Sequence, residues 1–176
     1  MRIAIIGYSG SGKSTTARII SKYARVPLLH LDSVHFGPGW TERSDDECRA
    51  IVKAFVEGGR WVIDGNYSKL CMDERLERAD TILYLNFNRF TCFFRAFRRY
   101  LKYRGQTRPD LGEDCPEKFD FAFISWLLWS GRTKARKKKF DEIAEKYNDK
   151  ILIIKNQKQL DAFLAMTIQL SQKHYG

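Results

Sequence analysis

The residues best suited to chemistry lie near the start of the chain, in a run rich in glycine. Residues 7–14 read Gly-Tyr-Ser-Gly-Ser-Gly-Lys-Ser, which matches the phosphate-binding pattern G-x-x-x-x-G-K-[ST]. An aliphatic strand pattern precedes the run and a helical pattern follows it, as the motif requires. The backbone N–H groups of such a loop point at phosphate oxygens, and the following helix adds its positive dipole end. We therefore predict a nucleotide site formed by Gly7, Tyr8, Ser9, Gly10, Ser11, Gly12, Lys13, Ser14 and Thr15.

The last three of these residues have separate predicted roles. Lys13 would contact the β- and γ-phosphates and take part in catalysis, Ser14 would place its hydroxyl on Mg²⁺, and Thr15 would lie near the α-phosphate. ATP and Mg²⁺ are the ligands that follow. The alternative is a glycine-rich turn that joins a strand to a helix by chance.

Two carboxylates follow strand patterns, and ligands of open α/β sheets bind beyond the carboxyl ends of the strands. Asp64 ends the run Arg60–Ile63, and we predict that it serves Mg²⁺ together with Ser14. The alternative role for Asp64 is to cap the next helix. Asp32 follows the run Pro27–Leu31 and is a candidate to position or deprotonate an attacking hydroxyl. A turn-forming role for Asp32 is the alternative.

Basic and aromatic residues concentrate in the second half of the chain. Of the 31 Lys and Arg residues, 13 fall in two runs: Arg89, Arg95, Arg98, Arg99, Lys102, Arg104 and Arg108, then Arg132, Lys134, Arg136, Lys137, Lys138 and Lys139. One interpretation is a lid-like insertion, residues 104–136, whose arginines reach the transferring phosphoryl group. Arg132 and Arg136 are the catalytic candidates because their i, i+4 spacing would place both on one helix face. The other interpretation is a nucleic-acid groove.

Most aromatic residues of the first basic run have a simpler interpretation. We expect Phe90, Phe93, Phe94 and Phe97 to pack inward beneath a solvated basic face. We expect Trp126 and Trp129 to lie in the core or to join the insertion to the body of the protein. These aromatics are therefore not predicted to stack on nucleic-acid bases.

Strand and helix patterns alternate along the chain, which predicts an α/β domain with a mostly parallel sheet. The predicted strands are Arg2–Ile6, Pro27–Leu31, Arg60–Ile63, Thr81–Asn86 and Lys150–Ile154. The predicted helices are Lys13–Tyr23, Ser44–Glu57 with Ser44 or Asp45 as N-cap, Arg89–Tyr103, Glu117 to about Tyr147, and Lys158 to about Ser171.

Length and composition limit the class of protein. The chain has 176 residues, 44% of them hydrophobic, and a formal net charge of +10, which predicts one domain, residues 1–176, with an anionic partner. No apolar run is long enough to span a membrane, so we expect a soluble, cytoplasmic protein with no membrane partner. The four cysteines form no C-x-x-C pair, and we predict reduced thiols.

Taken together, these motifs resemble a known family, the bacterial topology modulation proteins (FlaR-like), which are P-loop kinases related to adenylate kinase. The resemblance extends to about residue 165. It is carried by residues 7–14, His30-Leu31-Asp32, Pro38-Gly39-Trp40, residues 63–67 (Ile-Asp-Gly-Asn-Tyr), Arg89, Tyr103-Arg104-Gly105, residues 107–110 (Thr-Arg-Pro-Asp) and Cys115-Pro116-Glu117.

The resemblance implies a P-loop NTPase fold: three α/β/α layers, a five-stranded parallel sheet of order 2-3-1-4-5, and a helical lid insertion. It also implies that Asp64, in Ile63-Asp64-Gly65, serves the magnesium site. The chain departs from adenylate kinases at Asn66-Tyr67, where their motif continues Phe-Pro-Arg, so AMP is not the expected acceptor.

Our leading hypothesis is a Mg²⁺-dependent kinase that transfers the γ-phosphoryl group of ATP to a small acceptor, which would be a nucleotide, a nucleoside or another metabolite. Lys13, Arg132 and Arg136 would stabilise the transfer, and Asp32 would face the acceptor. Trp40 or Tyr67 would line the acceptor pocket. The rival hypothesis is a nucleic-acid-binding NTPase or regulator that affects DNA topology, and a third is a nucleotide sensor without catalysis.

Overall fold

The fold is built on one parallel sheet, as the sequence predicts. The structure is a computed structural model, and it describes residues 1–107, 110–111, 114–117 and 119–175. Within these residues the strands follow the order β2-β3-β1-β4-β5, and every neighbouring pair is parallel. Their bounds are β1 Arg2–Gly7, β2 Leu28–His30, β3 Trp61–Asp64, β4 Thr81–Leu85 and β5 Ile151–Ile154.

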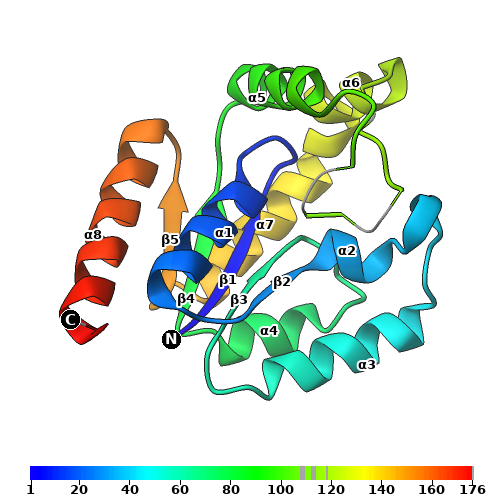
Figure 1. The fold of residues 1–176 in the computed structure, drawn as a ribbon. Helices are drawn as coiled ribbons and strands as arrows, with labels where there is room; N and C mark the ends of the chain where they lie inside the picture. Colours follow the sequence, from blue (N-terminus) through cyan, green and yellow to red (C-terminus); the bar gives the residue numbers. More distant parts are fainter. Residues whose placement is uncertain (108–109, 112–113, 118, 176) are drawn as a thin grey trace.

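Helices cover both faces of this sheet (Figure 1). α1 (Lys13–Ala24) lies in front of the sheet and packs beside α8 (Gln157–Tyr175), whereas α7 (Lys134–Lys146) lies behind it. The remaining helices are α2 Leu31–His35, α3 Asp45–Val56, α4 Met72–Arg78, α5 Arg89–Tyr103 and α6 Phe121–Leu128, with 3₁₀ turns η1 Pro38–Trp40 and η2 Ser130–Arg132. The arrangement is the predicted three-layer α/β/α fold.

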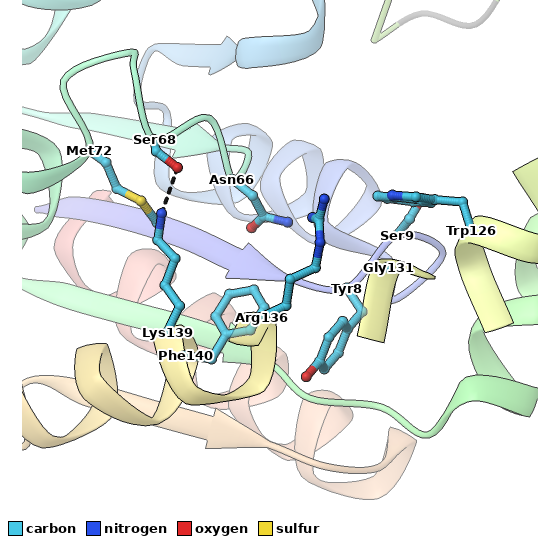
Figure 2. Close-up of a pocket in the computed structure, with 10 residues that line it drawn as sticks. All are labelled: Tyr8, Ser9, Asn66, Ser68, Met72, Trp126, Gly131, Arg136, Lys139 and Phe140. Carbon is cyan, nitrogen blue, oxygen red and sulfur yellow. Dashed lines mark hydrogen bonds between the residues drawn. The ribbon is translucent and has the colours of Figure 1, made fainter. Parts of the chain in front are cut away.

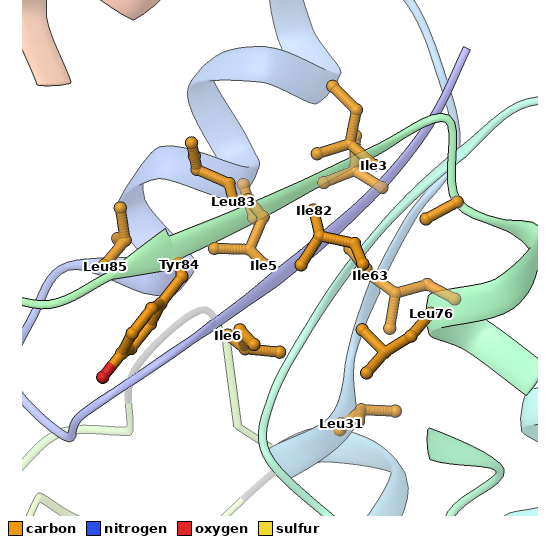
Figure 3. Close-up of a cluster of buried hydrophobic side chains, with 14 of the residues drawn as sticks. Ile3, Ile5, Ile6, Leu31, Ile63, Leu76, Ile82, Leu83, Tyr84 and Leu85 are labelled. Carbon is orange, nitrogen blue, oxygen red and sulfur yellow. The ribbon is translucent and has the colours of Figure 1, made fainter. Parts of the chain in front are cut away.

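The core forms because the three central strands are apolar on both faces, which is typical of parallel sheets. Ile5, Ile63 and Leu83 are fully buried, and Leu76 of α4 joins the same cluster (Figure 3). Behind the sheet, the rings of Tyr84 and Phe140 stack with their centroids 4.7 Å apart. This packing fixes the carboxyl ends of β1, β3 and β4, from which the candidate site is built.

Several local predictions hold in detail. Ser44 is the N-cap of α3 and forms a capping box with Glu47, each side chain meeting the other residue's backbone N–H. All four cysteines are free. No helix among the described residues is long and apolar enough to cross a membrane.

The predicted helix from Glu117 to about Tyr147 is wrong, because the chain breaks into α6, η2 and α7. Trp129 leaves the helical region with φ −128° and ψ −72°. Gly131 then passes so close to α6 that a Cβ there would lie 2.5 Å from the carbonyl oxygen of Trp126. Thr133 caps α7 by accepting a hydrogen bond from the Arg136 N–H. The sequence also gave no prediction for the short helices α2 and α4 or for η1.

Candidate active site

The glycine-rich run forms the turn between β1 and α1, and two of its glycines are required by close packing. Gly7 has φ +145°, and a Cβ there would lie 2.4 Å from the carbonyl oxygen of Leu85. Gly10 has φ +73°, and its Cβ would lie 2.4 Å from the carbonyl oxygen of Cys92 in α5. No L-side chain fits either position without moving the backbone. The loop is therefore pressed against β4 and α5, with α1 beginning at its end.

The side chain of Lys13 lies among groups of both signs. Its Nζ donates to the carbonyl oxygen of Tyr8 at 3.2 Å. Burial lowers the pKa of this ammonium, and the nearby carboxylates of Asp32 and Asp64 act in the opposite direction. The lysine is thus bonded to the phosphate loop and lies within electrostatic range of both carboxylates that the sequence singled out.

Ser14 and Asp64 meet directly. The Ser14 hydroxyl donates to Oδ2 of Asp64 at 2.9 Å, and the other carboxylate oxygen contacts Nδ1 of His30. Asp64 is the buried last residue of β3. It does not cap the next helix, because the N-cap position of α4 is Cys71. Thr15, predicted to lie near the α-phosphate, is exposed in the first turn of α1.

A hydroxyl and a carboxylate at this distance match the hard oxygen ligands that Mg²⁺ prefers. The described residues contain no group of three or more His, Cys, Asp or Glu side chains that could hold a metal ion. Such a group is not needed here, since Mg²⁺ in phosphoryl-transfer sites takes one or two protein oxygens and completes its shell with phosphates and water. The donor set therefore fits a nucleotide-bound magnesium ion.

Asp32 lies in the first turn of helix α2 rather than directly at a strand end, because β2 stops at His30. Its Oδ1 accepts a hydrogen bond from the Tyr67 hydroxyl at 2.9 Å. Burial raises the pKa of Tyr67, and the negative charge of Asp32 raises it further, so this hydroxyl stays a donor. Tyr67 comes from the loop after β3, which links Asp32 to the neighbourhood of Asp64.

The loop after β3 is held by two residues that the sequence analysis missed. Asn66 donates to the carbonyl oxygen of Gly7 at 2.6 Å and accepts from the N–H of Gly7 at 3.0 Å, which ties the loop to the start of the phosphate loop. Arg75 of α4 is fully buried and donates to the carbonyl oxygens of Leu70 and Tyr67, both at 2.9 Å. Burial lowers the pKa of Arg75 to about 10, well above neutral pH, so the guanidinium stays charged.

Arg132 and Arg136 do not share a helix face, which corrects the prediction. Arg132 ends the turn η2, where its guanidinium lies 3.9 Å from the ring centroid of Tyr8 and donates to the carbonyl oxygen of Phe87 at 3.0 Å. Arg136 lies after the N-cap of α7, in a separate helix. The i, i+4 spacing failed because Thr133 starts a new helix between the two arginines.

Arg136 lines a small cavity of about 80 Å³ beside the phosphate loop (Figure 2). Figure 2 shows its side chain reaching between Asn66 and the phosphate-loop residues Tyr8 and Ser9. Lys139 of the same helix donates to Ser68 Oγ at 2.5 Å on the far side. The lining residues are Tyr8, Ser9, Asn66, Ser68, Met72, Trp126, Gly131, Arg136, Lys139 and Phe140, and none is acidic.

Two further arginines, both on α5, lie near the phosphate loop without having been predicted there. Arg95 donates to the carbonyl oxygen of Ser11 at 2.7 Å, contacts the side chain of Gln157, and lies 4.0 Å from the ring centroid of Phe87. The positive charge of Arg99 also lowers the pKa of Lys13, although burial has the larger effect. The Nη2 atom of Arg99 lies 2.7 Å from Oε1 of Glu117. The sequence showed the density of arginines but not which of them turn inward.

The aromatic residues of α5 differ from the prediction. Phe93 is half-buried and packs against Phe119, but Phe90, Phe94 and Phe97 are exposed. Of the two tryptophans, Trp126 is half-buried against the core, whereas Trp129 is exposed. Inward packing was expected because most aromatics are buried, yet here the small residues Cys92 and Ala96 form the buried face of α5.

Comparisons with known proteins support the fold. No protein-family model and no curated protein matches the chain. Among solved structures, shikimate kinase from Acinetobacter baumannii, in complex with shikimate, aligns with 98% of this chain and 93% of its own at a TM-score of 0.57 and 17% identity. Shikimate kinase from Bacteroides thetaiotaomicron aligns with 98% of both chains at a TM-score of 0.47 and 18% identity.

This chain has the fold of a P-loop kinase. The likeness to shikimate kinase extends over nearly the whole length of both chains, and it agrees with the five-stranded parallel sheet described above. At this level of identity it says nothing about the acceptor. The resemblance to topology modulation proteins stays a prediction.

Proposed function

We propose that this protein is a Mg²⁺-dependent kinase that transfers the γ-phosphoryl group of ATP to a small acceptor. The observation that carries the proposal is the 2.9 Å hydrogen bond between Ser14 and Asp64, at the end of a glycine loop that also presents Lys13. A chance glycine turn gives no reason for a buried carboxylate to meet the serine of the motif. A kinase site requires that meeting, because both groups serve one magnesium ion.

Ser14 and Asp64 would hold Mg²⁺, directly or through water. When bound, the ion would supply positive charge that offsets the negative charge of the phosphates during transfer. The nucleotide phosphates would lie against the backbone N–H groups of residues 7–14, where close packing excludes side chains at Gly7 and Gly10. Lys13 would leave the Tyr8 carbonyl oxygen and donate to the β- and γ-phosphate oxygens, with Thr15 near the α-phosphate.

Asp32 is the candidate general base. The acceptor hydroxyl would lose its proton to the Asp32 carboxylate as its oxygen forms a bond to the γ-phosphorus. At the same time, the bond between the γ-phosphorus and the β–γ bridging oxygen would break, which releases ADP. Tyr67 donates to one carboxylate oxygen of Asp32. This bond leaves the other oxygen to face the acceptor.

The cavity beside the phosphate loop is the proposed place for an anionic group of the acceptor, although neither Asp32 nor the predicted pocket residues Trp40 and Tyr67 line it. The acceptor hydroxyl would extend from the cavity past Asn66 and Tyr67 toward Asp32. The cavity is lined by two cations, Arg136 and Lys139, and by no acidic residue. Its volume is about 80 Å³, and Ser9 and Asn66 also line it. This charge favours a compact acceptor that carries a negative group, for which the fork of Arg136 offers two donors. Arg132 does not line this cavity, because Tyr8 and Phe87 hold its guanidinium beside the phosphate loop. From there it would stabilise the transferring phosphoryl group.

The nucleic-acid hypothesis receives less support, because three arginines of the basic region are engaged within the protein. Arg95 contacts Ser11 and Gln157, Arg99 pairs with Glu117, and Arg132 lies on Tyr8. A groove for nucleic acid needs its cations free to meet a row of phosphates. A nucleotide sensor without catalysis would need neither Asp32 nor a cavity beside the phosphate loop.

The test compares nucleotide binding and acceptor use in the same preparations. ATP binding measured by calorimetry should strengthen with Mg²⁺ in the wild type, and Ser14→Ala and Asp64→Asn should each remove most of that gain. Acceptors should then be screened in matched pairs that differ by one anionic group, for example nucleosides against their monophosphates. The proposal is supported if the anionic member of a pair is phosphorylated and if Arg136→Gln raises the KM for that acceptor. Transfer only to neutral members would contradict the proposed acceptor class. ATP binding that does not depend on Mg²⁺ would contradict the proposed magnesium site.

A further inference from the structure

Helix α5 carries a row of apolar side chains on its solvent side. Phe90, Phe94, Phe97 and Leu101 are spaced by four, three and four residues, which places them on one face of the helix. Their exposed fractions are 65%, 61%, 39% and 56%. We call these four residues the outer stripe. An exposed row of this kind is unusual on a monomeric domain and marks an interaction surface.

Cations of α5 itself lie beside the outer stripe, and this helix carries no acid. Arg98 and Lys102 are exposed, and a rotation of 100° per residue places them along one side of the outer stripe. Two more exposed arginines lie at the ends of the helix, Arg89 at its start and Arg104 just after its end. The sequence from Arg89 to Thr107 contains no Asp or Glu. Across the exposed face, the order of groups is therefore apolar in the centre and positive at the edges.

The opposite side of α5 is anchored to the body of the protein. Cys92 and Ala96 are fully buried, and Arg95 and Arg99 make the inward contacts described above. In Figure 1, α5 lies at the top of the molecule beside α6, and its upper side meets no other helix or strand. The outer stripe thus lies on the side of α5 turned away from Cys92 and Ala96. Of its members, Phe97 also meets the Phe119 ring, with the centroids 5.4 Å apart.

We propose that the outer stripe of α5 binds the surface of an anionic lipid bilayer, with the helix lying in the plane of the interface. An exposed apolar stripe enters the acyl boundary without needing a complementary pocket, and the neighbouring cations then meet acidic headgroups. The expectation of no membrane partner rested on the absence of a spanning segment, and a helix that lies on the surface does not need one.

Two other occupants fit the charge pattern less well. A second copy of this chain packed stripe to stripe would bring Arg98 and Lys102 close to the cations of its partner with no acid on either helix. A nucleic acid would need cations at the centre of the exposed face to meet phosphates, but here the centre is apolar and includes the aliphatic Leu101. Both occupants become outcomes of the experiment.

The experiment is vesicle co-sedimentation of the full chain. The vesicles are phosphatidylcholine alone, or phosphatidylcholine mixed with an equal amount of phosphatidylglycerol. The wild type should bind the mixed vesicles much more strongly than the neutral ones, and added salt should weaken this binding. Phe94→Ser with Phe97→Ser should lower the partition coefficient by about tenfold or more, because two apolar anchors are lost. Arg98→Gln with Lys102→Gln should remove the preference for the anionic vesicles.

Matched controls separate this effect from a change in folding. Met166→Ser with Leu170→Ser removes two apolar residues of α8 that are similarly exposed, at 52% and 56%, and should leave vesicle binding unchanged. Circular dichroism and urea unfolding check that each variant is folded. Equal binding to both kinds of vesicle would overturn the proposal, and so would no binding at all. The proposal would also be overturned if the wild type bound no vesicles but formed dimers or bound an oligonucleotide, and if the Phe94/Phe97 variant lost that interaction. That result would identify the second copy or the nucleic acid as the true occupant.

Discussion

The Tyr67 hydroxyl donates to Oδ1 of Asp32 across 2.9 Å, and this bond joins the loop after β3 to the helix after β2. If Asp32 receives the acceptor proton, its orientation depends on that bond. Tyr67→Phe should therefore lower kcat by about tenfold, which is the usual cost of losing one hydrogen bond to a charged group, while the KM for ATP changes little. The measurement is steady-state kinetics with the acceptor that the screen identifies. Tyr23→Phe, at an exposed position, is the matched control, and equal kcat values for both variants and the wild type would contradict the role given to Tyr67.

Arg75 of α4 supports the same loop, and its replacement should lower the free energy of unfolding. Its guanidinium donates to the carbonyl oxygens of Leu70 and Tyr67, and more weakly to Gly65 at 3.4 Å. Arg75→Met leaves these buried acceptors without their donor, which should lower the free energy of unfolding by about 3 kcal/mol. Urea denaturation measures the change.

The control for this prediction is Arg78→Met on the same helix. Arg78 is partly exposed and pairs with Glu74, at 3.4 Å and i, i+4 spacing. Such a surface pair contributes little, so the loss should stay below about 0.5 kcal/mol. If both variants lose the same amount, the buried hydrogen bonds of Arg75 do not stabilise the loop as described.

Gly10→Ala should damage the phosphate loop, because the new Cβ would lie 2.4 Å from the Cys92 carbonyl oxygen at a φ of +73°. We expect a loss of about 1–3 kcal/mol in the free energy of unfolding. ATP binding should weaken by about tenfold or more, since the N–H groups that face the phosphates would shift. Gly59→Ala is the control, as nothing lies within 4 Å of its Cβ position. Calorimetry of ATP binding to both variants decides the matter, and unchanged binding in Gly10→Ala would speak against this loop as the phosphate site.

A pH-dependent contribution to stability is expected from Asp80, at the amino-terminal edge of the sheet. Burial acts to raise the pKa of its carboxyl, but hydrogen bonds from the Arg2 side chain and backbone outweigh this effect and hold the pKa below the ordinary value of 3.8. A carboxyl with a lowered folded-state pKa stabilises the protein above its unfolded-state pKa and loses that effect as the pH falls through its folded-state value. Asp80→Asn should therefore be less stable than the wild type at pH 7, and the gap should close below pH 3.8. A gap of constant size in thermal unfolding across this range would refute the assignment.

The features predicted correctly from the sequence are those with local signals. The glycine run, the aliphatic strands and the capping box at Ser44 each depend on residues a few positions apart, so periodicity and turn chemistry were enough to find them. The strand order came from a family resemblance rather than from any local pattern, and the parallel sheet confirms it.

The features that the sequence analysis missed depend on contacts between distant segments. Asn66 binds the backbone of Gly7, 59 positions away in the chain, and nothing near Asn66 in the sequence indicates that contact. Arg75 looked like one charged residue among many in a polar stretch, and only the tertiary fold buries it. The outer stripe of α5 was misjudged for the related reason that an aromatic pattern shows a helix face but not which side the body of the protein covers.

Lys13 and Ser14 at the start of α1 and Asp64 at the end of β3 form a site proposed to transfer a phosphoryl group rather than only to bind a nucleotide. The most direct test is γ-phosphoryl transfer from Mg²⁺-ATP to the acceptor panel, with the product identified by mass, in the wild type, Lys13→Ala and the exposed control Lys22→Ala. We expect a phosphorylated acceptor with the wild type and with Lys22→Ala. Lys13→Ala should lower the rate of transfer by at least about a hundredfold while its circular dichroism spectrum stays unchanged. ATP binding without transfer to any acceptor, or full transfer by Lys13→Ala, would contradict the proposal.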